Sequence, residues 1–139
     1  MDIRKESQYD KTKSMKREDS IQFKMIQKLK EDTEYKIIFD DDDKDEVSDI
    51  VAIKFFDNDY SKIIVDLYHC KFSTEDKAGK RLKDLYEVCG QAQRSFHWEH
   101  KVKNLIQHLK HRQNQRINKD WPSRYEIGGE EELQTIKIW

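Results

Sequence analysis

Three residues have the types and the spacing that hydrolytic chemistry on a phosphate ester requires: Asp49, His69 and Lys71. Asp49 falls on the same alternation as Val51 and Ile53, which predicts that it points to the apolar side of a strand. His69 and Lys71 are two residues apart, so they share one face of the following strand. A hairpin that joins the two strands would bring a carboxylate and an ammonium group into one pocket.

A carboxylate beside a lysine suits metal-dependent hydrolysis of a phosphodiester. Mg²⁺ takes oxygen ligands from one or two carboxylates, keeps several waters and lowers the pKa of a bound water, which generates a nucleophile. A neighbouring lysine orients that water or stabilises the charge that develops on the phosphate. The acidic segment 40–46 contains Glu46, which is a further candidate ligand.

Each of these residues also has a purely structural interpretation. Asp49 can accept a backbone amide at the start of a hairpin strand, and Lys71 can keep an edge strand from aggregating. A histidine on an apolar face, such as His69, is often a hydrogen-bonded core residue. The acidic run 40–43 is expected to be a solvated turn, because it lacks the terminal glutamate of a calcium-binding loop.

The apolar pattern predicts the elements that would position these residues. Apolar residues at helical spacing, preceded by Asp19 or Ser20 as N-cap, indicate an amphipathic helix, whereas alternation and turn residues indicate a hairpin. The expected elements are a helix over 20–31, strands over 35–39, 47–56 and 62–72, a long helix over about 77–97, and a second, basic helix.

The net charge of −1 hides a strong division along the chain. Residues 31–50 carry ten acidic and two basic residues, and residues 91–120 carry seven basic and two acidic ones. The total excludes binding of nucleic acid by bulk charge alone, but the division predicts an acidic pocket beside a basic surface. The candidate DNA-binding residues, whose alternative is a merely solvated face, are Lys101, Lys103, Lys110, Arg112 and Arg116.

A chain of 139 residues has room for one small domain, expected over 18–139 after a disordered segment 1–17. The apolar last residues suggest that the full protein continues beyond residue 139. No segment is apolar enough to span a membrane, which predicts a cytoplasmic protein with no membrane partner. In that compartment Cys70 and Cys89 are expected to be reduced and buried.

Together the motifs resemble the PD-(D/E)XK nuclease superfamily, which has the restriction-endonuclease-like fold. The resemblance covers about residues 18–125, and it is nearer to nuclease domains attached to helicases of bacterial restriction or phage-defence systems. It implies an α/β fold with a central mixed sheet built on a β-hairpin and flanked by helices, and a further strand after the long helix. The motifs are Glu46-Val-Ser-Asp49-Ile-Val, Asp66-Leu-Tyr-His69-Cys-Lys71, and Asp84-Leu-Tyr-Glu-Val-Cys-Gly-Gln-Ala-Gln93.

The resemblance implies that Asp49 is the metal-binding aspartate, that Lys71 is the catalytic lysine, and that the backbone carbonyl of Cys70 is a further ligand. Gln93, on the helical stripe of Cys89, would reach the metal-bound water or the substrate phosphate. Gln91 is a second candidate that faces elsewhere on the predicted helix.

The sequence departs from the family pattern at His69, which stands where a Glu or Asp usually precedes the lysine by two residues. Histidine is a poorer ligand for Mg²⁺ than for softer metals. Three consequences are open: Glu46, Glu18 or a glutamine completes the site, Mn²⁺ is favoured, or hydrolysis is weak or lost.

The expected function is therefore that of a DNA endonuclease dependent on Mg²⁺ or Mn²⁺, acting within a restriction or phage-defence helicase-nuclease. Its expected partners are DNA and a helicase domain of the same or an associated protein, and cleavage of both strands would imply a dimer or tandem action. One alternative is a catalytically inactive DNA-binding domain of the same fold, in which Lys71 neutralises a phosphate. Another alternative is a protein-interaction module.

Overall fold

The structure is a computed structural model that describes residues 7–9, 16–32, 34–42, 48–56, 59–70, 89–97 and 100–135. For residues 56, 59–62, 89–97, 100–102 and 135 the description covers the backbone only. The described elements are α1 (Ile21–Lys30), β1 (Tyr35–Asp40), β2 (Ile50–Phe56), β3 (Asp59–Cys70), β4 (Cys89–His97), α3 (His100–Asn118), β5 (Tyr125–Ile127) and α4 (Glu130–Thr135).

The strands form one sheet in the order β4-β3-β2-β1-β5, and its four pairings are all antiparallel within the described residues. The predicted hairpin is confirmed, because β2 and β3 pair in one register from Ile50 opposite Tyr68 to Phe55 opposite Ile63, and the register shifts before Phe56 opposite Asp59. The α/β class is also confirmed. The expected mixed sheet is wrong: β1, β2 and β3 form a meander, and β4 and β5 run antiparallel to their neighbours at its two edges.

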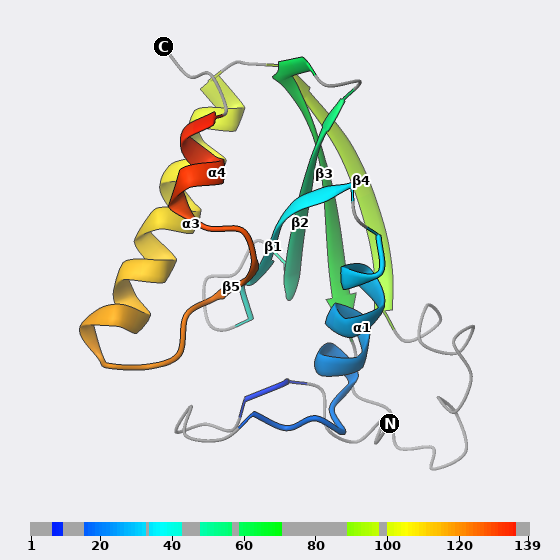
Figure 1. Cartoon of the computed structure of the whole chain (residues 1–139), viewed down its shortest axis with the longest axis vertical. Coiled ribbons are helices and arrows are strands. Elements are labelled where there is room, and N and C mark those ends of the chain that lie inside the picture. Colours follow the sequence, from blue (N-terminus) through cyan, green and yellow to red (C-terminus); the bar gives the residue numbers. More distant parts are fainter. Residues whose placement is uncertain are drawn as a thin grey trace.

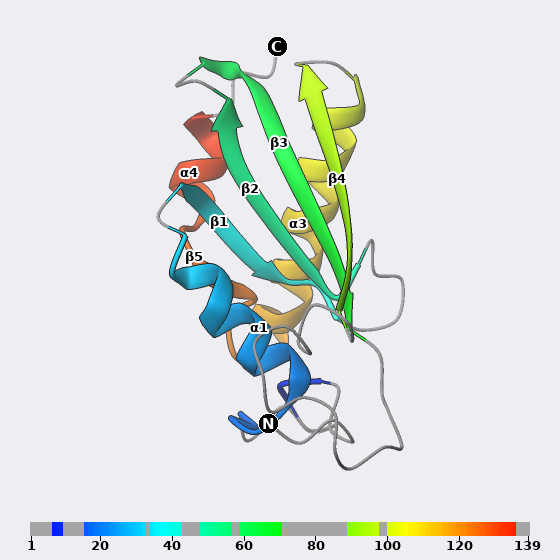
Figure 2. The same cartoon turned by 90° about the vertical axis from the view of Figure 1, so that its right-hand side faces the viewer.

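The sheet lies between two helical layers (Figures 1 and 2), with α1 on one face and α3 and α4 on the other. Each face has its own buried cluster of apolar side chains, because alternate residues of a strand point to opposite faces. The α1-side core contains Ile21, Met25, Ile26, Leu29, Tyr35, Ile38, Ile50, Ala52, Tyr68 and Cys70. The α3-side core contains Ile37, Phe39, Val51, Ile53, Ile63, Val65, Ile106, Leu109 and Leu133.

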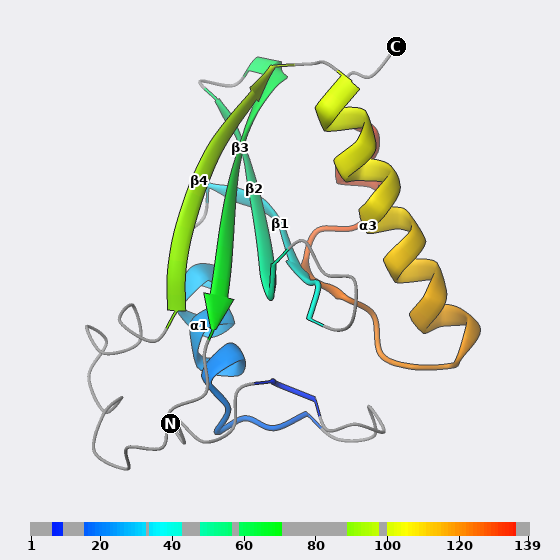
Figure 3. The same cartoon turned by 180° about the vertical axis from the view of Figure 1, so that it is seen from behind.

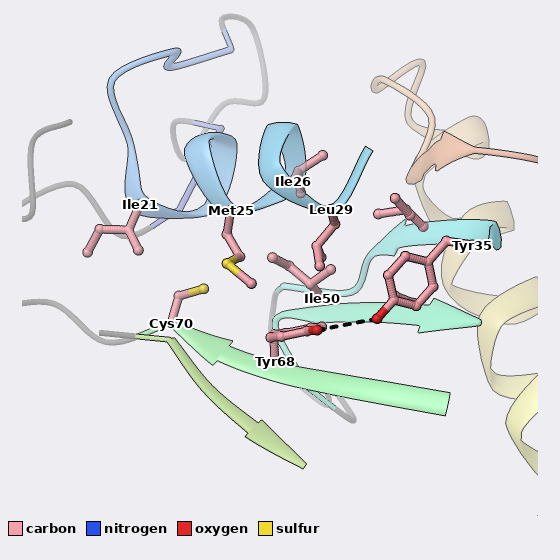
Figure 4. Close-up of a cluster of buried hydrophobic side chains, with 10 residues drawn as sticks. Ile21, Met25, Ile26, Leu29, Tyr35, Ile50, Tyr68 and Cys70 are labelled. Carbon is pink, nitrogen blue, oxygen red and sulfur yellow. Dashed lines mark hydrogen bonds between the residues drawn. The ribbon is translucent and has the colours of Figure 1, made fainter. Parts of the chain in front are cut away.

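The predicted first helix is confirmed almost to the residue. It spans Ile21–Lys30, and the Ser20 side chain caps it by accepting a hydrogen bond from the Phe23 backbone N–H at 3.1 Å. That bond satisfies one of the amide groups that have no partner in the first turn of a helix. Its apolar stripe contributes four residues to the α1-side core (Figure 4).

The prediction of a long helix over 77–97 is wrong from Cys89 onward, where the chain forms β4. All nine residues of β4 pair with β3, from Cys70 opposite Cys89 to Lys62 opposite His97. The edge of β3 presents a row of backbone donors and acceptors, and this pairing satisfies it, which overrides the local helical pattern. Residues 71–88, which include Lys71, lie outside the described residues.

The expectation that the cysteines are reduced is also wrong. Cys70 is disulfide-bonded, and opposite it on β4 is Cys89, the only other cysteine in the sequence. The missed strand explains the error, because directly opposed residues of antiparallel strands have the Cα separation that a disulfide needs.

Part of the N-terminal segment has a defined place, contrary to the expectation that residues 1–17 are disordered. Gln8 is fully buried, and Tyr9 forms an isolated bridge with Lys16. The Gln8 side chain donates to the Asp40 carboxylate at 2.8 Å, and its backbone N–H donates to the Gln22 side chain at 3.2 Å. The described part of this segment therefore packs against both α1 and the end of β1.

A glycine fixes the turn between β5 and α4. Gly128 has a φ of +75°, and a Cβ added there would lie 2.2 Å from the backbone oxygen of Lys36 on β1. Only glycine combines this conformation with so close an approach of two backbones. The turn that carries α4 onto the sheet is thus held directly against β1.

Candidate functional site

Asp49 lies at the end of the sheet where β2 begins and β3 ends. Its side chain is buried, and its Oδ2 accepts a hydrogen bond from the backbone N–H of Cys70 at 2.5 Å. Asp49 therefore contacts the residue that directly precedes Lys71 in the chain. One oxygen of this carboxylate also has the structural use that the sequence left open, since it accepts a backbone amide.

His69 is not a buried core histidine. The side chain is exposed, at a position paired with Gly90 of β4. Its neighbours along β3, Tyr68 and Cys70, are both buried in the α1-side core. His69 is thus accessible to a ligand at the same end of the sheet as Asp49.

Gln91 and Gln93 belong to a strand rather than to the helix that the sequence predicted. In the β3–β4 register, Gln91 is opposite Tyr68 and Gln93 is opposite Asp66. The helical reasoning that separated the two glutamines therefore does not apply. Their side chains lie outside the description, so their suggested roles stay predictions.

A buried polar group beside these positions was not singled out from the sequence. The Tyr35 hydroxyl donates to Asp66 Oδ2 and lies 3.3 Å from the Tyr68 hydroxyl (Figure 4). A register shift in β1 between Tyr35 and Ile37 brings Tyr35 to this face. Burial, followed by the hydrogen bond to Asp66, raises the pKa of Tyr35, so its hydroxyl keeps its proton. The signal in the sequence was the polar Asp66 within the largely apolar run 63–68 of β3.

The expectation of a solvated acidic turn is wrong for its first two residues, because Asp40 and Asp41 are buried. Arg112 Nε donates to Asp41 Oδ1 at 2.9 Å, and Arg112 Nη2 donates to the Asp41 carbonyl at 2.6 Å. His108 Nε2 lies 3.0 Å from Asp41 Oδ2. Two side chains from the middle of α3 are thus fixed to the end of β1.

Asp40 is held by a second set of contacts. Arg116 Nη2 lies 3.6 Å from Asp40 Oδ2, and Arg124 Nη1 donates to the Asp40 carbonyl at 2.9 Å. Burial raises the pKa of Asp40, although Arg116 and the Gln8 hydrogen bond act in the opposite direction. Burial also lowers the pKa of Arg124 to about 10, with the neighbouring Arg116 and Arg112 charges adding to this effect. These arginines and Asp40 are buried away from water, so their contacts with one another offset the cost of desolvating their charges.

These contacts correct the predicted DNA-binding set. Arg112 and Arg116 are 4% and 1% exposed, and both are paired with aspartates. Their expected position on the surface is therefore wrong: an amphipathic helix places every third or fourth residue inward, and these two fall on the inward side. Lys103 is exposed and Lys110 is partly exposed, whereas the Lys101 side chain lies outside the description.

The paired aspartates are joined to the candidate site through the backbone. The Asp41 N–H donates to the Asp49 carbonyl at 3.0 Å. A continuous path therefore runs from Arg112 on α3 through Asp41 to Asp49. Arg112, which the sequence predicted to bind DNA, thus helps to hold the backbone of Asp49 through Asp41.

A divalent cation is the cofactor that the resemblance implies, and the described residues supply part of a site for it. They contain no group of three or more His, Cys, Asp or Glu side chains arranged to hold a metal ion. Asp49 brings a carboxylate next to the backbone of Cys70. Glu18 is exposed, and Glu46 lies outside the described residues. The described residues therefore provide one expected carboxylate ligand, Asp49, and not a complete coordination shell.

Among the helices in the described ranges, none combines the length and the hydropathy that a membrane crossing requires. Comparison with known proteins gives no assignment: no family model, no curated protein sequence and no solved structure matches this chain.

Proposed function

We propose that this chain is a metal-dependent DNA endonuclease domain with a restriction-endonuclease-like core, serving a restriction or phage-defence helicase-nuclease. The observation that carries the proposal is the hydrogen bond from the Cys70 backbone to the buried Asp49 carboxylate. The nuclease motif requires an aspartate on one strand of a hairpin close to a lysine on the next strand. Asp49 contacts Cys70, which directly precedes Lys71 in the sequence. The order of one helix, three meandering strands and a further strand is compatible with that core, whereas the antiparallel pairing of every described strand departs from its mixed sheet.

The residues divide the proposed reaction among them. A bound Mg²⁺ or Mn²⁺ would supply an activated water and neutralise charge on the scissile phosphate. Asp49 would hold the cation, and the hydrogen bond from the Cys70 amide fixes the orientation of its carboxylate. Lys71 stabilises the negative charge that grows on the phosphate oxygens in the transition state. Exposed His69 would add a nitrogen ligand, which favours Mn²⁺ over Mg²⁺.

The test is plasmid nicking by the purified chain in Mg²⁺ or Mn²⁺. We expect Asp49→Asn and Lys71→Ala each to lower the nicking rate by about 10²-fold or more, the scale seen when a transition-state contact is removed. Lys36→Ala, which removes an exposed lysine of β1, and exposed Asp32→Asn are matched controls that should cleave normally. Circular dichroism checks that Asp49→Asn is folded, because Asp49 also supports the Cys70 backbone. Nicking that survives both site variants would refute the proposal.

A second function is favoured by one observation: His69 occupies the position that usually holds an acidic ligand. This feature suits a catalytically inactive DNA-binding domain of the same fold. Binding of a DNA duplex in EDTA that weakens with salt, together with no cleavage in either metal, would support this second function. Absence of both binding and cleavage would leave a protein-interaction module.

A further inference from the structure

Helix α3 has two sides of different chemistry. Its inward side contributes Ile106 and Leu109 to the α3-side core and the two paired arginines, Arg112 and Arg116, to the contacts at the end of β1. Figure 3 shows the helix running along the sheet, with its other side turned away. The exposed residues on that outward side between 103 and 118 are Lys103, Asn104, Gln107, His111, Asn114, Gln115, Ile117 and Asn118.

The outward side is rich in side-chain amides and has no acidic residue. From residue 100 to 119 the sequence contains no Asp or Glu. At 3.6 residues per turn, five amides lie in one stripe opposite the buried arginines, and Lys103 and Lys110 lie along one flank of it. A helix face of this kind has donors and positive charge for an anionic partner, and its own charges do not repel one.

The surface is bounded and positioned by its neighbours. On the same face of the sheet, α4 carries Glu130, Glu131 and Glu132, so a polyanion is repelled from that flank. In the middle of α3, Arg112 is bonded to Asp41, whose backbone meets Asp49. The amide stripe is therefore on a helix that is fixed to the proposed catalytic end of the sheet.

We propose that the outward amide stripe of α3, with Lys103 and Lys110, binds the phosphate backbone of duplex DNA. Asn and Gln side chains donate hydrogen bonds to phosphate oxygens, and lysines release condensed counterions when they neutralise phosphates. The choice of DNA over another polyanion rests on the proposed function, whereas the surface itself rests on the exposure and charge of α3. The buried arginines take no part in this contact.

The experiment measures binding of a labelled 20-base-pair duplex by fluorescence anisotropy in EDTA, at several salt concentrations. Lys103→Gln/Lys110→Gln should reduce the magnitude of the negative slope of log Kobs against log salt by about 2, since each phosphate-bound lysine contributes about 1. Gln107→Ala/Asn114→Ala should weaken binding about ten-fold at fixed salt and leave the slope unchanged, because neutral hydrogen bonds release no counterions. Lys24→Gln/Lys36→Gln removes the same charge from exposed lysines on α1 and β1, and should match the unaltered protein.

The outcomes separate this inference from the proposed function. The proposed DNA contact of α3 is refuted, even where nicking is observed, if the α3 variants bind DNA as the unaltered protein does. It is also refuted if Lys24→Gln/Lys36→Gln reduces the magnitude of the salt slope equally. If the magnitude of the salt slope decreases as expected and neither metal supports nicking, the DNA-binding surface of α3 is supported and the nuclease proposal is refuted. Loss of binding to phosphatidylserine vesicles with no loss for DNA would identify a lipid surface instead and overturn the inference.

Discussion

The two faces of the sheet hold their helices by different means. On one face, α1 is held by four buried apolar side chains, Ile21, Met25, Ile26 and Leu29. On the other, the side chains of α3 that the structure describes include buried Ile106 and Leu109 and partly buried Leu105, and the same side of the helix carries arginines paired with buried aspartates. The α1 contact is apolar, whereas the α3 contact combines apolar packing with buried ion pairs.

This difference teaches how each helix is positioned. Apolar packing is non-directional and roughly proportional to the buried area, so it holds α1 on the sheet. A buried ion pair adds little net stability, because desolvation offsets its attraction, but losing one partner leaves a charge in the interior. The arginines therefore fix where α3 lies along β1, and with it the segment between Asp41 and Asp49.

The largest expected effect comes from breaking the ionic side. Asp41→Ala leaves the buried Arg112 charge without its carboxylate and should lower the free energy of unfolding by about 4 kcal/mol. Glu31→Ala is the control, because Glu31 is 69% exposed in its pair with Lys28 and should cost under about 0.5 kcal/mol. Urea unfolding measures both. A loss below about 1 kcal/mol for Asp41→Ala would show that Arg112 regains water and that the two faces do not differ as described.

A somewhat smaller effect is expected on the apolar side. Ile26→Ala removes a fully buried side chain from beneath α1 and should lower the free energy of unfolding by about 3 kcal/mol, through lost burial and the cavity left behind. Ile117→Ala is the matched control, since Ile117 on α3 is 54% exposed and should change stability by under about 0.5 kcal/mol. Equal losses for the two variants would contradict the assignment of the core.

The smallest effect concerns a hydroxyl on the α3 side. The buried Tyr125 hydroxyl has no hydrogen-bond partner among the residues that the structure describes, and the ring packs edge-on against Phe39. Tyr125→Phe keeps that ring contact and removes the unsatisfied group, so it should be neutral or stabilise by up to about 1 kcal/mol. Destabilisation by more than this amount in urea unfolding would reveal a hydroxyl partner.

The same variant has a signature in alkaline solution. Burial, with the charges of Glu130 and Glu132, raises the pKa of Tyr125 from its ordinary value of 10.0 to about 12. The folded state then holds the Tyr125 proton more tightly than the unfolded state does. The contribution of this group to the free energy of unfolding is therefore fully present below pH 10 and is lost as the pH rises from 10 to 12. The stability difference between Tyr125→Phe and the unaltered protein should therefore widen over that range in favour of the variant. A constant difference would contradict the raised pKa.

The sequence predicted the elements whose signals are local. Ser20 and the apolar spacing after it located α1, and alternation located β1 and the hairpin of β2 and β3. The hairpin in turn brought Asp49 to the end of β3, as expected, although the lysine that follows Cys70 lies outside the described residues. The assignment of Asp49 and Lys71 to hydrolysis stays a prediction.

The errors occur where a distant partner decides the outcome. Cys89 lies on a helical stripe of the sequence, but β3 offers a free edge and draws the segment into a strand. Arg112 and Arg116 are residue types typical of a DNA-binding surface, but both are buried and form ion pairs with Asp41 and Asp40. In each case the local pattern indicates one outcome, and a contact with another part of the chain decides a different one.

The sequence by itself determined the α/β class, the hairpin and the division of charge between an acidic segment and a basic helix. The tertiary structure decided which of those charges face water. The physical reason is that periodicity places a residue on one side of its own helix or strand, whereas burial depends on what packs against that side. For α3 that packing pairs the arginines inward and buries Gln113, and it leaves Lys103 and five other amides outward.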